Sequence, residues 1–423
     1  MVDEEKLGPD VLVFWQGLGR LHVDESAHEV KCRVTVSGSA DGDLEIEVDH
    51  QLGTVAFALI DHDHTWIEIP GVIEHIDVLV RHSSGNSEGR TTLTFGLRRS
   101  PVWVVKAQEL RAGRTALINF GQYRLSTPTL RRFELKACGW RLDVIPVSEG
   151  TLGFSKAMRS EDYQVTHQVE FAREDGSVFT TQEAQSFLED LSLYLSFCRG
   201  RWVGTSFTVA FNLDGEVGLE QWGSGRVSPW QAPDSWLDIH HGDPIVDLYR
   251  PFCEKLADQP WKEVVSWLVY WFTRAETETA GPDGSCILLQ AALERFAWHL
   301  LVRERKAISE KGFKGLEAAD QLRLMLNLLS VPATVPGGLP ELLKLAKSKG
   351  LDGPGVFTFI RNRIVHPPKL TESSTGLPYY EAYCLAKWYL ELAVLSSCGY
   401  VGKYSNRTLK QRWVGAVENV PWT

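Results

Sequence analysis

An arginine, an asparagine and a histidine lie close together in the segment FIRNRIVHPP, residues 359–368. Arginine binds a phosphate through a planar, two-pronged fork of N–H donors. Histidine is the side chain that can accept or release a proton near neutral pH. Arg361 and His366 are therefore a minimal set of groups for cleaving RNA without a metal ion. Asn362 could orient one of them or contact the sugar–phosphate backbone.

The spacing of these groups constrains how they could act together. Arg361 and His366 are five residues apart, so on one straight helix their side chains point about 140° apart. Pro367 disfavours helical geometry at the residue before it, so we expect the helix to end at His366. There the negative end of the helix dipole favours a protonated imidazole. Two copies of this helix around a twofold axis would bring both pairs into one cleft, which predicts a homodimer.

The last part of the chain must position these groups, and its apolar residues recur with the 3.6-residue period of helices. Pro260 and Pro354 suit first helical positions, and Gly399 ends the last long apolar segment. These signals predict an all-α bundle over residues 246–423. The expected helices cover about 245–258, 261–278, 286–308, 315–330, 338–349, 354–366 and 377–398.

The region before residue 246 has a different pattern, in which short segments alternate apolar and polar residues and glycine- or serine-bearing turns separate them. Such spacing favours a β-sandwich or barrel-like domain over residues 1–245, with one helix near 181–198. The stretch 221–244 is rich in Trp, Gly, Pro and His and is interpreted as a long loop. The predicted fold class is α+β and multidomain. The expected strands include 29–36, 43–49, 91–97, 102–105, 165–171 and 207–211.

Length, charge and cysteine content limit the classes of protein to which this chain could belong. A chain of 423 residues predicts two or three domains. Its net charge is −10, but residues 1–245 carry −14 and residues 246–423 carry +4, which is compatible with RNA handling at one site. Its longest apolar run, Val264 to Phe272, is short for a membrane span, and the acidic N-terminus lacks a signal-peptide core. Seven scattered cysteines imply no disulfide framework. We expect a cytoplasmic protein without membrane contact.

The segment around Arg361 resembles the RNxxxH form of the Rx4–6H motif of the HEPN superfamily (higher eukaryotes and prokaryotes nucleotide-binding domains). The resemblance covers about residues 286–400. A β-rich domain followed by such a bundle is similar to the layout of ApeA-type bacterial abortive-infection proteins. The segments that carry the resemblance are 316–329, the Pro- and Gly-rich connector after it, 360–368 and 379–395.

The resemblance implies a metal-independent endoribonuclease that needs no cofactor. In such enzymes the ribose 2′-hydroxyl attacks the adjacent phosphate, leaving a 2′,3′-cyclic phosphate and a 5′-hydroxyl. His366 would be the acid and base, Arg361 the phosphate clamp, and Asn362 their support. It further implies a toxin-like effector of antiviral, anti-phage defence that acts on RNA, with tRNA among the candidates. The acidic domain would hold it inactive until a phage-derived or cellular trigger arrives.

Two other functions stay open. Some HEPN proteins lack activity, so the bundle could be a silent module that binds RNA or a nucleotide, or that mediates dimerisation. The β-rich domain could instead carry a hydrolase or lectin-like binding activity, with the bundle as dimeriser. Three tryptophans of this region could stack bases or fill an interdomain core: Trp222, Trp230 and Trp236.

Weaker RNA-binding candidates lie elsewhere in the helical region. Arg363 follows the motif asparagine and could be a second phosphate contact or an exposed solubilising charge. Arg295 and His299 are four residues apart on one predicted helix, where they could support the site or form an ordinary pair. A basic run could follow an RNA backbone or be a solvated helix end. It comprises Arg303, Arg305, Lys306, Lys311 and Lys314.

Two segments have the residue types of metal sites, residues 61–64 (DHDH) and 240–243 (HHGD). Alternate residues of a strand point to opposite faces, so at most two ligands of the first segment would converge. Nothing in the sequence near the second segment completes a coordination set. We therefore expect no metal.

Overall fold

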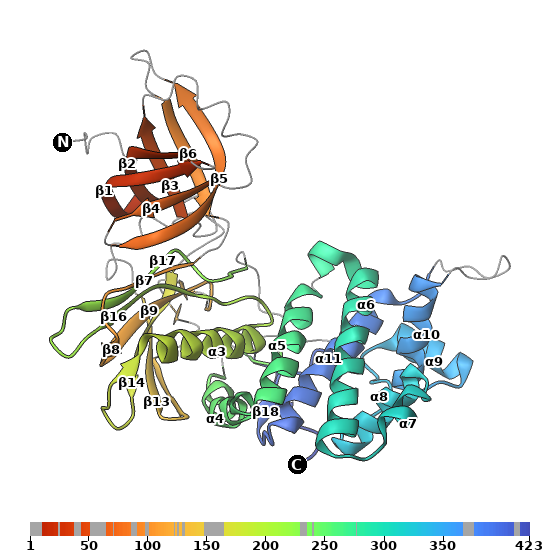
Figure 1. The fold of residues 1–423 in the computed structure, drawn as a ribbon. Helices are drawn as coiled ribbons and strands as arrows, with labels where there is room; N and C mark the ends of the chain where they lie inside the picture. The colour runs from red at the N-terminus through yellow and green to blue at the C-terminus, as the bar shows by residue number, and fades with distance from the viewer. Residues whose placement is uncertain are drawn as a thin grey trace. The chain divides into compact units, whose positions relative to one another are not determined.

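The computed structural model describes residues 11–23, 26–37, 44–50, 65–70, 72–85, 91–97, 101–121, 123–124, 127–128, 132–147, 165–228, 235–238, 241–275, 277–366, 376–409 and 415–423. The fold is α+β, with a β-rich N-terminal region followed by a mostly helical C-terminal region (Figure 1). The chain divides into two compact units. The first comprises Met1–Glu134, Gly139–Ser192 and Val203–Gln231, and the second Leu135–Cys138, Leu193–Trp202 and Ala232–Thr423.

The first six strands form a closed barrel in the order β1-β2-β3-β6-β5-β4. Each strand runs antiparallel to its neighbours, and β1 closes the barrel by pairing with β4. In β4 buried and partly buried residues alternate, as expected when one face of a strand lines the barrel interior. The strands are β1 (Val11–Val23), β2 (Ser26–Ser37), β3 (Leu44–His50), β4 (Thr65–Ile69), β5 (Ile73–Gly85) and β6 (Thr91–Leu97).

A second sheet has seven strands in the order β12-β13-β14-β9-β16-β17-β7. Helix α3 (Thr181–Arg199) lies along it (Figure 1). The ring of Phe187 on α3 stacks on Trp140 of the sheet at 4.2 Å between centroids. The strands are β7 (Val102–Val105), β9 (Ala112–Ile118), β12 (Phe133–Ala137), β13 (Trp140–Pro146), β14 (Val165–Arg173), β16 (Thr205–Phe211) and β17 (Val217–Trp222). Two-residue strands form the pairs β8 (Glu109–Leu110) with β15 (Phe179–Thr180) and β10 (Tyr123–Arg124) with β11 (Thr127–Pro128).

The start of α3 is encoded locally by a capping box. The Thr180 hydroxyl accepts a hydrogen bond from the Glu183 N–H at 3.2 Å, and the Glu183 carboxylate accepts one from the Thr180 N–H at 2.7 Å. Two backbone donors that the first helical turn leaves unpaired are thereby satisfied. This reciprocal pair explains why a helix begins here in the middle of a β-rich region.

The second unit is a helical bundle with a short two-stranded sheet at its end, β18 (Lys403–Tyr404) and β19 (Glu418–Asn419). The helix α6 contains a break at Gly281, whose φ of 68° is in the region that favours glycine. The helices are α4 (Asp243–Ala257), α5 (Gln259–Arg274), α6 (Thr277–Trp298), the π-helical η3 (His299–Glu304), α7 (Glu310–Lys314), α8 (Ala318–Leu328), α9 (Pro340–Lys349), α10 (Gly353–Val365) and α11 (Tyr379–Ser397).

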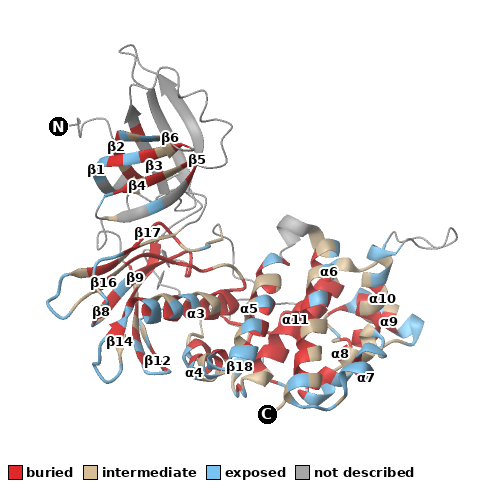
Figure 2. Cartoon of the chain, viewed as in Figure 1, coloured by how far each residue is buried: buried red, intermediate tan, exposed pale blue. Residues whose placement is uncertain are grey.

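Helix α11 is the central element of the bundle. Every residue from Ala382 to Leu395 is buried, as the continuous red of α11 in Figure 2 shows. Its buried charges are paired: both carboxylate oxygens of Glu391 accept hydrogen bonds from Arg407, at 2.5 and 2.8 Å. The Lys387 ammonium donates to the Tyr383 hydroxyl at 3.1 Å. Buried charges are tolerated only with such partners.

The segment Gly281–Glu304 has the length and the mean hydropathy, 1.2, of a helix that could cross a membrane. This corrects the expectation that no apolar segment reaches that length. However, 61% of the apolar window is buried inside the protein. Helix α6 packs against α5, α8, α10 and α11, as the core helix of a bundle does.

The predicted helices correspond to observed ones within a few residues, with two differences. The segment 286–308 is not one helix, because α6 changes to π-helical geometry at His299. The short α7 was not expected; the helix expected over 315–330 is observed as α8. The expected loop at 221–244 begins after Trp222, since β17 extends to that residue. Its described residues before α4 contain no helix and no strand of the sheets.

Candidate functional site

The helix that carries the RNxxxH segment is α10, and its apolar residues determine how it lies in the bundle. Val356, Phe357 and Ile360 are fully buried on one face. Through this face α10 packs against α6, α8, α9 and α11. Pro354 occupies the first turn, where its missing N–H leaves no intrahelical bond unmade. The burial of one face directs the residues between the apolar positions away from the core.

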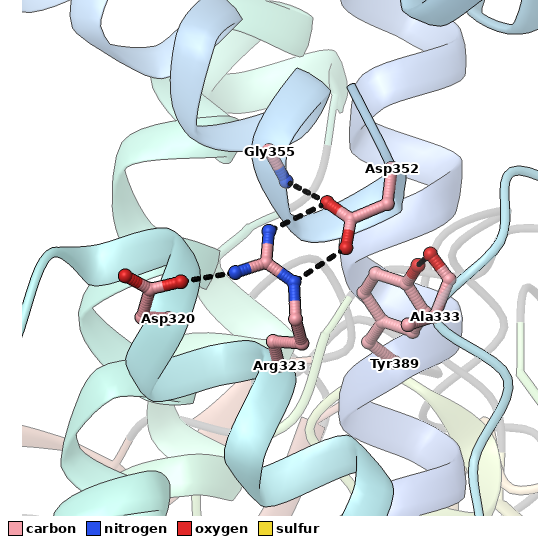
Figure 3. A network of polar contacts seen from close by, with 6 residues as sticks. All are labelled: Asp320, Arg323, Ala333, Asp352, Gly355 and Tyr389. Carbon is pink, nitrogen blue, oxygen red and sulfur yellow. Dashed lines mark hydrogen bonds and ion pairs between the residues drawn. The ribbon is translucent and has the colours of Figure 1, made fainter. Parts of the chain in front are cut away.

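The start of α10 is fixed by a network of polar contacts (Figure 3). Asp352 is the N-cap, and its carboxylate accepts a hydrogen bond from the Gly355 N–H at 2.9 Å. Arg323 of α8 donates two parallel hydrogen bonds to the same carboxylate, at 2.6 and 2.9 Å. Arg323 also pairs with Asp320 one turn earlier on α8. The fork of Arg323 therefore joins α8 to the first turn of α10.

The ionisation of Asp352 follows from these contacts. Partial burial opposes the charged carboxylate, but the hydrogen bonds from Arg323 and from the Gly355 N–H outweigh it. The pKa of Asp352 is consequently held below its usual value. The guanidinium of Arg323 has a raised pKa because of the hydrogen bond to Asp352. Both partners are charged at neutral pH.

A second contact at the same end depends on the absence of a side chain. The Gly353 N–H donates to the Ala333 carbonyl at 2.7 Å, and the Tyr389 hydroxyl of α11 donates to the same carbonyl at 3.3 Å. A Cβ atom at Gly353 would overlap the Tyr389 hydroxyl. Only glycine allows the chain to approach α11 so closely here.

The other end of α10 presents the candidate catalytic groups. The Arg361 guanidinium donates from Nη1 to Asn362 Oδ1 at 3.2 Å, and its Nε is shielded from solvent without a hydrogen-bond partner. Asn362 and His366 are exposed, and Arg361 is half-buried. A half-buried guanidinium with exposed polar neighbours can receive an anion from solvent.

His366 lies where the helix ends, as its position before Pro367 predicts. Its backbone is extended, with φ −111° and ψ 130°, while its N–H still donates to the Asn362 carbonyl at 2.8 Å. No hydrogen bond or ion pair joins its imidazole to Arg361 within the described part of the chain. One chain therefore does not bring the two groups together, and a composite site from two copies stays a prediction.

Arg363 has a different environment from Arg361. Its guanidinium lies over the Phe359 ring at 5.2 Å, and the Lys349 ammonium lies 5.5 Å from the centroid of the same ring. Cation–π contacts of this kind hold exposed cations against a helix. Arg363 is thus a structural neighbour of the candidate site, well suited as a control for it.

Arg295 and His299 lie at a second location in the bundle. They line a cavity of about 770 Å³ formed by the start of α5, the end of α6 and η3, and no residue of α10 lines it. Arg295 pairs with Glu263 at 2.7 Å. His299 is 6% exposed and meets Trp261 edge-on at 4.5 Å. Burial lowers the pKa of His299, although the Glu304 and Asp258 carboxylates oppose that shift.

The remaining candidate residues have structural roles or lie outside the described part. Residues 61–64, His240 and Trp230 lie outside it. His241 Nδ1 is 3.3 Å from Asp238, whose carboxylate also accepts from the Gly415 N–H at 2.7 Å. No group of three His, Cys, Asp or Glu residues within the described ranges could hold a metal ion. Of the three tryptophans that could stack bases, Trp222 and Trp236 lie in the described part, and both are buried core residues.

Two sets of residues around these sites were not singled out from the sequence. Asp352 precedes Pro354 and had the signal of an N-cap, but its partner Arg323 carries no local signal. The cavity residues Trp298 and Glu304 belong to no recognisable sequence motif either. The cavity that they line depends on α5 packing beside α6, which a linear pattern does not encode.

Comparison with known proteins gives a family context for most of the chain. The family model described as "YopA central domain" matches residues 110–233, and the one described as "YopA C-terminal domain" matches residues 258–419. The chain is 26% identical over 424 residues to "SPbeta prophage-derived uncharacterized protein YopA" of Bacillus subtilis (strain 168), covering 97% of this chain and 91% of that protein. No solved structure matches the chain. Neither domain description names a HEPN domain, so the HEPN resemblance stays a prediction.

Proposed function

We propose that this protein is a metal-independent endoribonuclease of HEPN type. The observation that carries the proposal is the exposed end of α10, where Asn362 holds the Arg361 guanidinium at 3.2 Å and His366 follows at the point where the helix ends. Arginine supplies a phosphate clamp and histidine a proton acceptor and donor, which are the groups that transesterification of RNA requires.

In the proposed reaction the ribose 2′-oxygen attacks the adjacent phosphorus atom. One imidazole, His366, removes the 2′-hydroxyl proton, and a proton is delivered to the departing 5′-oxygen. Arg361 neutralises the charge that grows on the phosphate oxygens, and Asn362 holds the guanidinium in place. The products are a 2′,3′-cyclic phosphate and a 5′-hydroxyl. A homodimer would supply two imidazoles, one for each proton transfer.

The biological role that we propose is that of a toxin-like effector in anti-phage defence. The protein would then act in the cytoplasm, where it meets cellular RNA, tRNA included. The prophage origin in the description of the Bacillus subtilis relative is compatible with a role in conflicts between phages. The β-rich region would restrain the nuclease until a phage-derived or cellular trigger releases it.

The direct experiment uses the purified full chain with tRNA and mixed RNA in the presence of EDTA. Arg361→Ala and His366→Ala should each lower the cleavage rate at least about 100-fold. Arg363→Ala is the matched control, because it removes a neighbouring cation that lies against Phe359. Cyclic-phosphate ends should appear with the parent protein and with Arg363→Ala, and not with Arg361→Ala or His366→Ala. Cleavage that persists in His366→Ala would overturn the assignment of that residue.

A second candidate function is a silent module that binds RNA or mediates dimerisation. It is favoured by the separation of Arg361 and His366 within one chain, where no hydrogen bond among described residues connects them. Under this alternative, RNA binds and none is cut, and His366→Ala leaves binding unchanged. Growth of bacteria that express the parent or His366→Ala separates the two functions, since only an active toxin would make growth depend on His366.

A further inference from the structure

A cavity with convergent polar groups lies beside η3. Its volume of about 770 Å³ is within the range of sites for small ligands. Among its lining residues are the indoles of Trp261 and Trp298, the cation Arg303, the carboxylate Glu304 and the buried His299. Aromatic faces, a cation and hydrogen-bonding groups together match the parts of a nucleotide: a planar base, a phosphate and polar edges.

We propose that this cavity binds a nucleotide, with the phosphate on Arg303, the base against Trp298, and an amino group of the base on Glu304. The proposal is independent of the proposed nuclease, because no residue of α10 lines the cavity. It concerns either a free nucleotide or one nucleotide of a single strand, since both present the same chemistry.

The pair of Arg303 and Trp298 provides the phosphate and base contacts. The Arg303 guanidinium lies 4.9 Å from the centroid of the Trp298 ring, and Arg303 is exposed. No carboxylate among the described residues forms a salt bridge with Arg303, in contrast to Arg295, which pairs with Glu263. Arg303 can therefore turn toward a phosphate at little electrostatic cost. The indole face that it leaves is then available for stacking on a base.

Glu304 supplies an unsatisfied acceptor. Glu304 forms ion pairs with Lys255 through Oε2 and with Arg305 through Oε1, each at 3.5 Å, while its shielded Oε2 accepts no hydrogen bond from the described residues. A shielded carboxylate oxygen without a donor is an unfavourable arrangement that a ligand N–H would relieve. The amino groups of adenine, guanine and cytosine are such donors. Uracil has no amino group and offers only its ring N3–H, which predicts weaker binding of uridine nucleotides.

His299 completes the polar edge of the cavity. Because burial lowers its pKa, the imidazole is neutral at pH 7 and has one donor and one acceptor nitrogen. A base edge alternates donors and acceptors in the same way. A neutral histidine is also compatible with the nearby cation Arg303, which a protonated one would repel.

The π-helical geometry of η3 explains how these groups converge. The Arg305 N–H donates to the Leu300 carbonyl at 2.9 Å, five residues back instead of four. With this wider turn His299 and Glu304 are one turn apart and lie on the same side. In a regular α-helix, a spacing of five residues would turn the two side chains about 140° apart. Single π-helical turns are frequent at functional sites.

The test is calorimetric titration of the purified full chain with GMP, AMP, CMP and UMP. At least one amino-bearing nucleotide should bind, and UMP should bind about tenfold more weakly. Arg303→Ala should weaken binding about tenfold or more, and Glu304→Gln should remove the discrimination against UMP. Lys344→Ala is the matched control, since Lys344 is an exposed cation of α9 outside the cavity.

A second titration separates the two sources of the ligand. Oligo(A) and oligo(U) of ten nucleotides are titrated beside the mononucleotides; binding of oligo(A) alone identifies the ligand as a nucleotide within a strand. The proposal is overturned if the parent binds neither class, or if Arg303→Ala and Lys344→Ala bind alike. Failure of the nuclease proposal leaves the mononucleotide result unaffected, because no residue of α10 lines the cavity.

Discussion

The two ends of α10 differ in how their polar groups are used. At the first end the Asp352 carboxylate accepts three hydrogen bonds, and Gly353 lies against α11 without space for a side chain. At the last end Asn362 and His366 are exposed, and Arg361 Nε has no hydrogen-bond partner. At the first end the polar groups hold the helix in position. The last end keeps its polar groups available, which is the property a reactive site needs.

This difference predicts that substitutions at the two ends separate stability from activity. Changes at the start of α10 should lower the free energy of unfolding, and they should reduce activity only as the protein unfolds. Changes at the end should leave the free energy of unfolding almost unchanged and remove activity.

The largest expected loss of stability is that of Gly353→Ala. The new methyl group would overlap the Tyr389 hydroxyl and lie 2.7 Å from the Ala333 carbonyl oxygen, so the backbone must shift. We expect a loss of about 3 kcal/mol in the free energy of unfolding, measured by urea denaturation. Gly337→Ala is the control, because its methyl group would meet nothing within 4 Å. Equal midpoints for the two variants would contradict the close-approach argument.

Arg323→Ala should have the next largest effect. It removes both hydrogen bonds from the guanidinium to Asp352 and leaves that carboxylate with the Gly355 N–H. Because Arg323 is about one-third exposed, we expect about 1–2 kcal/mol at pH 7. Lys314→Ala is a suitable comparison, since its i,i+4 pair with Glu310 is exposed and should contribute at most about 0.5 kcal/mol.

The contribution of Asp352 should depend on pH in a defined direction. Its folded pKa is lower than the ordinary value of 3.8, so the unfolded state binds the proton more readily. The stabilisation is present above pH 3.8 and is lost as the pH falls through the folded pKa. Asp352→Asn should therefore destabilise the protein at pH 7, and the difference from the parent should shrink below about pH 4. A difference that stayed constant down to pH 3 would exclude this linkage.

The smallest change in stability is expected for His366→Ala. The side chain is exposed, and its backbone N–H, which caps the helix by donating to Asn362, is retained. The free energy of unfolding should change by less than about 0.5 kcal/mol. Thermal unfolding measured beside the RNA-cleavage assay tests this, and a large loss of stability would mean that any loss of activity says nothing about chemistry.

Much of the fold was predictable because its signals are local. Pro354 and the apolar residues that follow it predicted α10, and Pro367 predicted the end of that helix at His366. Strand alternation predicted the β-rich region, but it could not distinguish a closed barrel from a sandwich, since both bury one face of each strand. The π-helical turn at His299 has the same apolar period as an α-helix over a few residues, so no linear pattern marks it.

By itself the sequence determined the positions of most helices to within a few residues, and it placed Arg361, Asn362 and His366 at one helix terminus. Propensities, caps and turns act between residues a few positions apart, so their effects can be predicted from the sequence. Only the tertiary structure decided that Arg323 holds Asp352, that Arg295 and His299 line a cavity separate from α10, and that Lys387 and Glu391 are buried. These contacts join residues that are distant along the chain. They form because apolar surface is buried, and which surface is buried depends on the whole fold.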